Sequence, residues 1–128
     1  MKLQDARDIT TKIEQGAWVR NLPNLPGVAV KVRGWGNSDH RRIRAKMATE
    51  TPPEQLSDPQ IQDALQARAI LETILVDWSG FDDCPFTREN AEMVLHDSTL
   101  AVIRAGIEYA AGTVALEGKA SLDDDVKN

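Results

Sequence analysis

Two histidines and one cysteine are the side chains best suited to catalysis or metal binding. A catalytic histidine needs a nucleophile or an orienting carboxylate within hydrogen-bond reach, and a metal site needs three or four ligands. No local pattern around His40 or His96 supplies either set, so we expect both to be solvated at helix ends. Cys84 is the only cysteine and lacks the signature of a cysteine nucleophile, so we expect a free, unreactive thiol.

Acidic residues and glycines suggest a calcium-binding loop and a nucleotide-binding loop, but neither motif is complete. Asp77 begins no calcium-binding loop, because the glutamate required at position 12 is replaced by Arg88. The Gly34-Trp35-Gly36 segment is not followed by the glycines or lysine of a nucleotide-binding loop. Trp35 could stack on a nucleic-acid base, but we favour a core position at the end of a hairpin. We therefore expect no enzyme activity, metal or cofactor.

The chain is divided by charge. Residues 1–48 carry ten basic and four acidic side chains, whereas residues 49–128 carry five and sixteen. Clustered cations attract nucleic acid or an acidic partner. The pI near 5.0 is nevertheless far below the high pI that is typical of a nucleic-acid-binding domain. We therefore predict that a protein partner or another copy of the chain contacts a basic cluster, formed by Arg33, Arg41, Arg42, Arg44 and Lys46. The alternative is a small nucleic-acid-binding regulator that uses residues 31–46.

Size and composition favour a mostly helical fold. A chain of 128 residues is long enough for one domain with its own core. Hydrophobic residues make up 41% but aromatic residues only 5%, a balance that favours helix packing over a β-sandwich. The single cysteine and the lack of a signal-peptide core lead us to expect a reducing cytoplasm. The most apolar stretch, residues 100–116, contains Arg104 and Glu108, so we expect no membrane span.

The hydrophobic pattern predicts a small helical domain over residues 1–117 with a short N-terminal β-hairpin. Alternating valines and a proline-rich turn place the hairpin at about residues 17–33. Helical spacing predicts helices at 3–15, 39–48 and 88–95, another from Pro59 to about Trp78, and a last one after Asp97 or Ser98. Residues 118–128 have too little apolar content to fold, so we predict a disordered acidic tail.

Apolar residues in the second half have two possible roles. Leu100, Ile103, Ile107 and Val114 lie three, four or seven apart and form one seam of the last predicted helix. Such a seam either binds a partner helix or lies in the core, and the sequence leaves both possibilities open. Four aromatic residues are expected to be structural anchors: Trp18, Trp78, Phe81 and Phe86.

The order of motifs over roughly residues 14–115 resembles the tail assembly chaperones of long-tailed bacteriophages. The segment Ile74–Phe81 contains a Trp-x-Gly turn, and a Pro-Phe-Thr cap at residues 85–87 begins a short helix before the final one. Gly16-Ala17-Trp18-Val19, the strand ending in Val32-Arg33-Gly34 and the helix start at residues 37–42 are also similar in type and order. The loop before Pro85 is shorter than is usual in that family.

The resemblance implies a non-catalytic assembly factor without a cofactor. Members of that family bind the tape measure protein, a long and largely helical chain, and help the major tail tube protein to assemble around it. They act in the host cytoplasm, for a phage or a prophage, and are absent from the mature virion. The opposite charges of the two halves further suggest self-association, with copies stacked head to tail.

Overall fold

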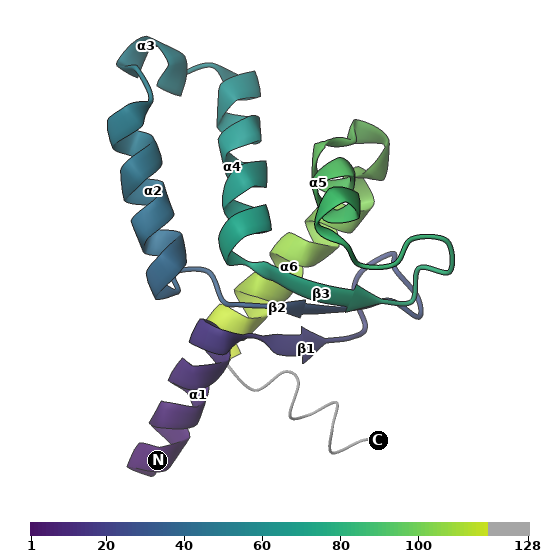
Figure 1. Ribbon diagram of the computed structural model, residues 1–128. Helices are drawn as coiled ribbons and strands as arrows, with labels where there is room; N and C mark the ends of the chain where they lie inside the picture. Colours follow the sequence, from purple (N-terminus) through teal and green to yellow (C-terminus); the bar gives the residue numbers. More distant parts are fainter. Residues whose placement is uncertain (118–128) are drawn as a thin grey trace.

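Three short antiparallel strands form the sheet at the centre of the fold (Figure 1). The computed structural model describes residues 1–117, so the predicted tail at 118–128 lies outside the described residues. The strands are β1 (Ala17–Val19), β2 (Ala29–Val32) and β3 (Leu75–Ser79), in the order β1-β2-β3. The predicted hairpin is confirmed as β1 and β2, but the sheet has a third strand that the sequence analysis did not predict.

The third strand occupies the end of a predicted helix. The prediction of one helix from Pro59 to Trp78 is wrong, because α4 (Pro59–Thr73) ends before β3 begins. Leu75 and Trp78 are three apart, which fits one face of a helix. In the structure both are buried, although residues three apart on a regular strand point to opposite faces.

A β-bulge explains how one strand buries both residues. Lys31 lies opposite Asp77 and Val32 opposite Leu75, so Val76 is an extra residue in β3. An extra residue reverses the alternation of side chains along a strand. Pairing with β3 also satisfies backbone groups of β2 that a two-stranded hairpin leaves open.

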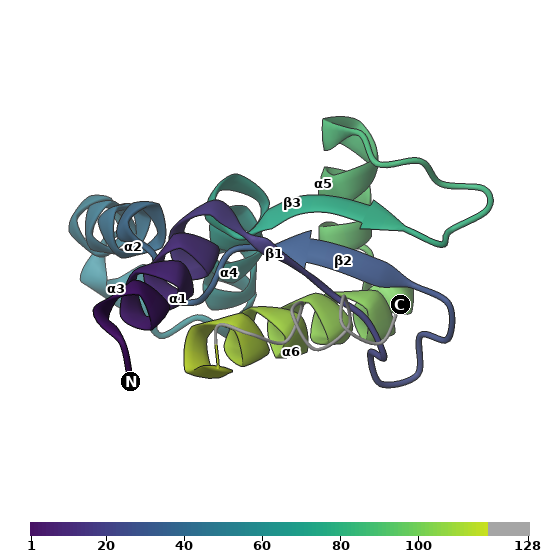
Figure 2. The same ribbon diagram turned by 90° about the horizontal axis from the view of Figure 1, so that it is seen from below.

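Helices α4 and α6 pack on the inner face of the sheet, and the other helices pack against these two (Figures 1 and 2). Figure 1 shows α2 and α4 side by side as two antiparallel arms joined by α3, with α5 on the other side of α4. Figure 2 shows α6 running along the sheet. The remaining bounds are α1 (Leu3–Gln15), α2 (Ser38–Glu50), α3 (Pro53–Leu56), α5 (Arg88–His96), the 3-10 turn η1 (Ser98–Leu100) and α6 (Ala101–Glu117).

The main core lies between the sheet and α4, α5 and α6. Its largest fully buried apolar side chains are Val30, Val32, Ile70, Ile74, Ile107 and Val114. From the predicted seam, Ile103, Ile107 and Val114 are buried in this core and Leu100 packs against it. The structure therefore places that seam in the core. A second, smaller cluster of Ile43, Met47, Ala69 and Leu65 joins α2 to α4.

Aromatic residues hold the loop between β3 and α5 against the core. Trp78 is buried, and its ring meets Phe81 and Phe86 edge-on at centroid distances of 5.5 and 5.0 Å. Its Nε1 donates a hydrogen bond to the Cys84 carbonyl at 2.9 Å. Gly80 has a φ of 99°, and a side chain there would collide with the Gly27 carbonyl, so the Trp-x-Gly turn requires glycine.

Trp18 does not anchor the core. It lies half-buried on the outer face of the sheet, opposite Lys31. Its neighbours Ala17 and Val19 take the inward positions of β1. A three-residue strand buries either its middle residue or its two ends, so β1 contacts the core through Ala17 and Val19 and Trp18 stays half-buried.

Candidate protein-binding surface

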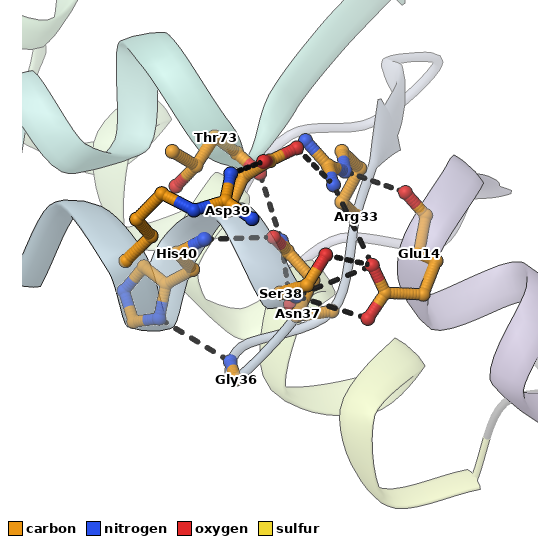
Figure 3. Close-up of polar contacts among 10 residues, drawn as sticks. Glu14, Arg33, Gly36, Asn37, Ser38, Asp39, His40 and Thr73 are labelled. Carbon is orange, nitrogen blue, oxygen red and sulfur yellow. Dashed lines mark hydrogen bonds and ion pairs between the residues drawn. The ribbon is translucent and has the colours of Figure 1, made fainter.

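A buried asparagine connects the turn after β2 with the two helices that form the candidate surface (Figure 3). Asn37 Oδ1 accepts a hydrogen bond from the His40 backbone N–H at 2.8 Å and caps α2. Its Nδ2 donates to the carbonyls of Gly34, at 3.0 Å, and Thr73, at 2.8 Å. Because Thr73 ends α4, a single side chain fixes the start of α2 relative to the end of α4.

Arg33, predicted to contact a partner, is used largely within the chain. Its Nε donates to the Glu14 carbonyl at 2.6 Å and its Nη2 to Asp39 Oδ2 at 2.8 Å. The Glu14 carboxylate accepts hydrogen bonds from the backbone N–H and the hydroxyl of Ser38 at 2.9 and 2.7 Å. These contacts join α1, the turn after β2, and α2 (Figure 3). The Ser38 hydroxyl lowers the pKa of Glu14, and the Arg33 guanidinium lowers that of Asp39.

The other predicted cations, Arg41, Arg42, Arg44 and Lys46, are exposed on α2. At 100° per residue, Arg44 and Lys46 fall on opposite flanks of the buried Ile43–Met47 stripe. The cations therefore surround the exposed part of α2 instead of forming one stripe. Arg42 Nη1 pairs with Asp39 Oδ1 at 2.7 Å, whereas Arg44 has no ion pair or hydrogen bond with another side chain among residues 1–117.

A groove of about 550 Å³ lies between α2 and α4, and Arg44 lines it. Its apolar lining comes from Met47, Ala48, Leu56, Pro59, Leu65 and Ala69, and its polar lining from Arg44, Gln62, Asp63, Gln66 and Arg104. Arg104 Nη1 already pairs with Asp63 at 3.0 Å, and its Nε with Glu108 at 3.4 Å. The groove thus combines an apolar floor with one guanidinium, that of Arg44, which is available to a partner.

Local sequence patterns do not reveal this groove. The available signal was the pair Ile43 and Met47 on α2 and the pair Leu65 and Ala69 on α4, each four residues apart. Nothing local in the sequence shows that these pairs face each other. The short helix α3, which joins the two arms, was also not predicted.

The residues suited to catalysis form no site in the described part of the chain. His40 is buried and not solvated as expected, and its ring meets Trp35 edge-on at 5.0 Å. His40 Nδ1 accepts a hydrogen bond from the Gly36 N–H at 3.3 Å, and Nε2 has no partner. His96 is exposed. Within residues 1–117, no three His, Cys, Asp or Glu side chains are placed to hold a metal ion.

In comparisons with known proteins, no family model, curated protein or solved structure matches the chain. The function is therefore inferred from the chain's own residues and from the order of motifs described above.

We predict that Asn37→Ala lowers the free energy of unfolding by about 2 to 4 kcal/mol, because the helix cap is lost and the buried Thr73 carbonyl loses its donor, while the Gly34 carbonyl keeps only the backbone N–H of residue 37. Asn37→Ser is the matched control, since a serine caps α2 but cannot reach the carbonyl of Thr73. It should recover about 1 kcal/mol of the loss. Urea denaturation measures both. A cost below about 1 kcal/mol for Asn37→Ala would show that other contacts hold the two helices.

His40 should make folding less stable as the pH falls. Burial lowers its pKa, and the charge of Arg44 lowers it further. The unfolded histidine therefore takes up a proton below about pH 6.5 while the folded one stays neutral, so stability decreases from there downward. The carboxyls of Glu14 and Asp39 also have lowered pKa values in the folded protein, but their protonation reduces stability only below about pH 4.5. His40→Gln should remove the loss between pH 7 and 5. Equal losses in both proteins over this range, measured as urea midpoints, would contradict the assignment.

Proposed function

We propose that this protein is a tail assembly chaperone of a long-tailed bacteriophage, which binds its partners and catalyses no reaction. The proposal is carried by the groove between α2 and α4, with its apolar floor and the free guanidinium of Arg44. The order of motifs over residues 14–115 supports the same function. The proposed client is the tape measure protein, with the major tail tube protein as a second partner, in the host cytoplasm.

A helix is the partner structure that such a groove accommodates best. The groove lies between two antiparallel helices (Figure 1), and grooves of this kind receive apolar anchors spaced three or four residues apart. The anchors would contact Met47 and Leu65. A carboxylate beside them on the partner would pair with Arg44, and an arginine–carboxylate pair adds geometric specificity. A long helical chain with exposed apolar residues would in this way be kept from aggregating.

A second candidate function rests on the four exposed cations of α2. Arg41, Arg42, Arg44 and Lys46 could contact the phosphates of a nucleic acid, as expected for a small regulator. Phosphate binding depends on the number of cations and weakens steeply with salt. Groove binding depends on one cation among them, and this difference allows a direct test.

Two variants with the same charge change separate these functions. Wild-type protein co-expressed with the longest helical protein encoded beside it should keep that partner soluble and co-purify with it. Arg44→Glu should reduce the co-purified partner by about tenfold, because it places a carboxylate where a partner carboxylate binds. Arg42→Glu changes the same charge on the same helix outside the groove and should leave the yield within about twofold.

Three results would contradict groove binding. One is a partner that stays insoluble beside the wild-type protein, and another is an equal loss with both variants. The third is salt-sensitive binding to random duplex DNA that both variants weaken equally, which would favour the regulator. Urea midpoints of both variants should match that of the wild type, since both side chains are exposed.

A further inference from the structure

α6 is apolar on the side that faces away from the core as well as on the side that faces it. Val102, Tyr109 and Leu116 are seven residues apart and expose 42%, 52% and 88% of their surface. Ala105 and Gly112 lie between them, so this outer face advances in alternating steps of three and four, as in a coiled-coil seam. The buried seam of Ile103, Ile107 and Val114 occupies the opposite side.

A helix that is apolar all round is normally covered on every side. By length and composition alone, Ser98–Leu116 could cross a membrane, but the core helix of a soluble protein passes the same test. In Figure 2, no other described helix or strand lies on the side of α6 that faces away from the sheet. Within residues 1–117, the outer face is therefore open around Val102, Tyr109 and Leu116, while the Trp35 ring borders it at Gly112.

The outer face carries almost no charge. Arg104 and Glu108 are the only charged residues between Ser98 and Leu116; they pair with each other at 3.4 Å, and Glu108 lies at the edge of the face, beside Tyr109 and Gly112. Arg104 also pairs with Asp63 of α4 at 3.0 Å, on the side of α6 away from Tyr109. The basic surface of α2 is not complementary to such a face, because its cations would lose water without gaining a partner. The same apolar face of another copy is complementary to it.

We propose that α6 pairs with α6 of a second copy, antiparallel, about a two-fold axis at Tyr109. A two-fold interface requires a patch that is complementary to itself. The order Val102, Ala105, Tyr109, Gly112, Leu116 alternates large and small residues on both sides of Tyr109, and Val102 and Leu116 each lie seven residues from it. Antiparallel pairing brings Val102 next to Leu116 of the second copy, lets the small residues approach closely, and opposes the two helix dipoles.

The expected interface is small. A face of about 15 residues is about 22 Å long, and two such faces bury on the order of 1,000 Å², near the lower limit for a specific interface. We therefore expect a reversible dimer that forms with rising concentration. Tyr109 does not line the groove between α2 and α4, so this inference is independent of the proposed function.

Sedimentation over a wide range of concentrations tests the pairing. The wild type should show a monomer–dimer equilibrium, and Tyr109→Glu should raise the dissociation constant by at least about tenfold, because it buries a charge at the centre of the interface. Met93→Glu is the matched control on α5, where Met93 is 47% exposed, and should leave the equilibrium unchanged. A wild type that stays monomeric, or a Tyr109→Glu protein that still dimerises, overturns the proposal.

Cysteine cross-linking tests the orientation, in a Cys84→Ser background. Tyr109→Cys should form a disulfide-linked dimer on oxidation, because the axis brings both copies of residue 109 together. Val102→Cys should cross-link with Leu116→Cys in a mixture but not with itself. Self-linking of Val102→Cys would show parallel pairing and overturn the antiparallel arrangement. If phosphatidylcholine vesicles instead bind the monomeric wild type and not Tyr109→Glu, the face contacts lipid and the proposal is wrong.

Discussion

The buried amide of Asn37 is the interaction on which the arrangement of the sheet and the paired helices depends. Asn37, His40 and Thr73 are the buried polar residues among residues 1–117, and all three belong to this one hydrogen-bonded cluster. A buried amide without partners would be costly, but each donor and acceptor bond made here connects a different part of the chain. Buried networks of this kind favour one arrangement over others, so the position of the groove follows from the position of Asn37.

Internal ion pairs decide how much of the basic cluster is offered to a partner. Arg33 is occupied by Glu14 and Asp39, and Arg104 by Asp63 and Glu108. The charge that remains available lies on α2, beside an apolar groove. The outer face of α6 is largely apolar, with Glu108 at its edge, and is separate from that groove. The two proposed surfaces thus differ in chemistry as well as in place, and one protein could bind a client and a second copy at once.

Sequence reasoning succeeded where the determinants are local. The hairpin and the start of α4 at Pro59 depend on residues close together in the chain, and the structure has both. It failed at β3, because a bulge gives Leu75 and Trp78 a helical spacing on a strand. The burial of His40 and the groove depend on a contact between Asn37 and Thr73, which are 36 residues apart. The spacing along α6 predicted an apolar seam for either the core or a partner, and only the tertiary structure shows that this seam is buried and that the other side of the helix is also apolar and exposed.

Amide hydrogen exchange of the chain, with and without the co-purified helical partner, tests groove binding most directly. If a helix binds there, we expect slower exchange in α2 and α4 around Met47 and Leu65, because binding suppresses local opening of these helices. Exchange in β3 should stay unchanged. Protection confined to the sheet or to α6, or no protection anywhere, would contradict the proposed binding surface.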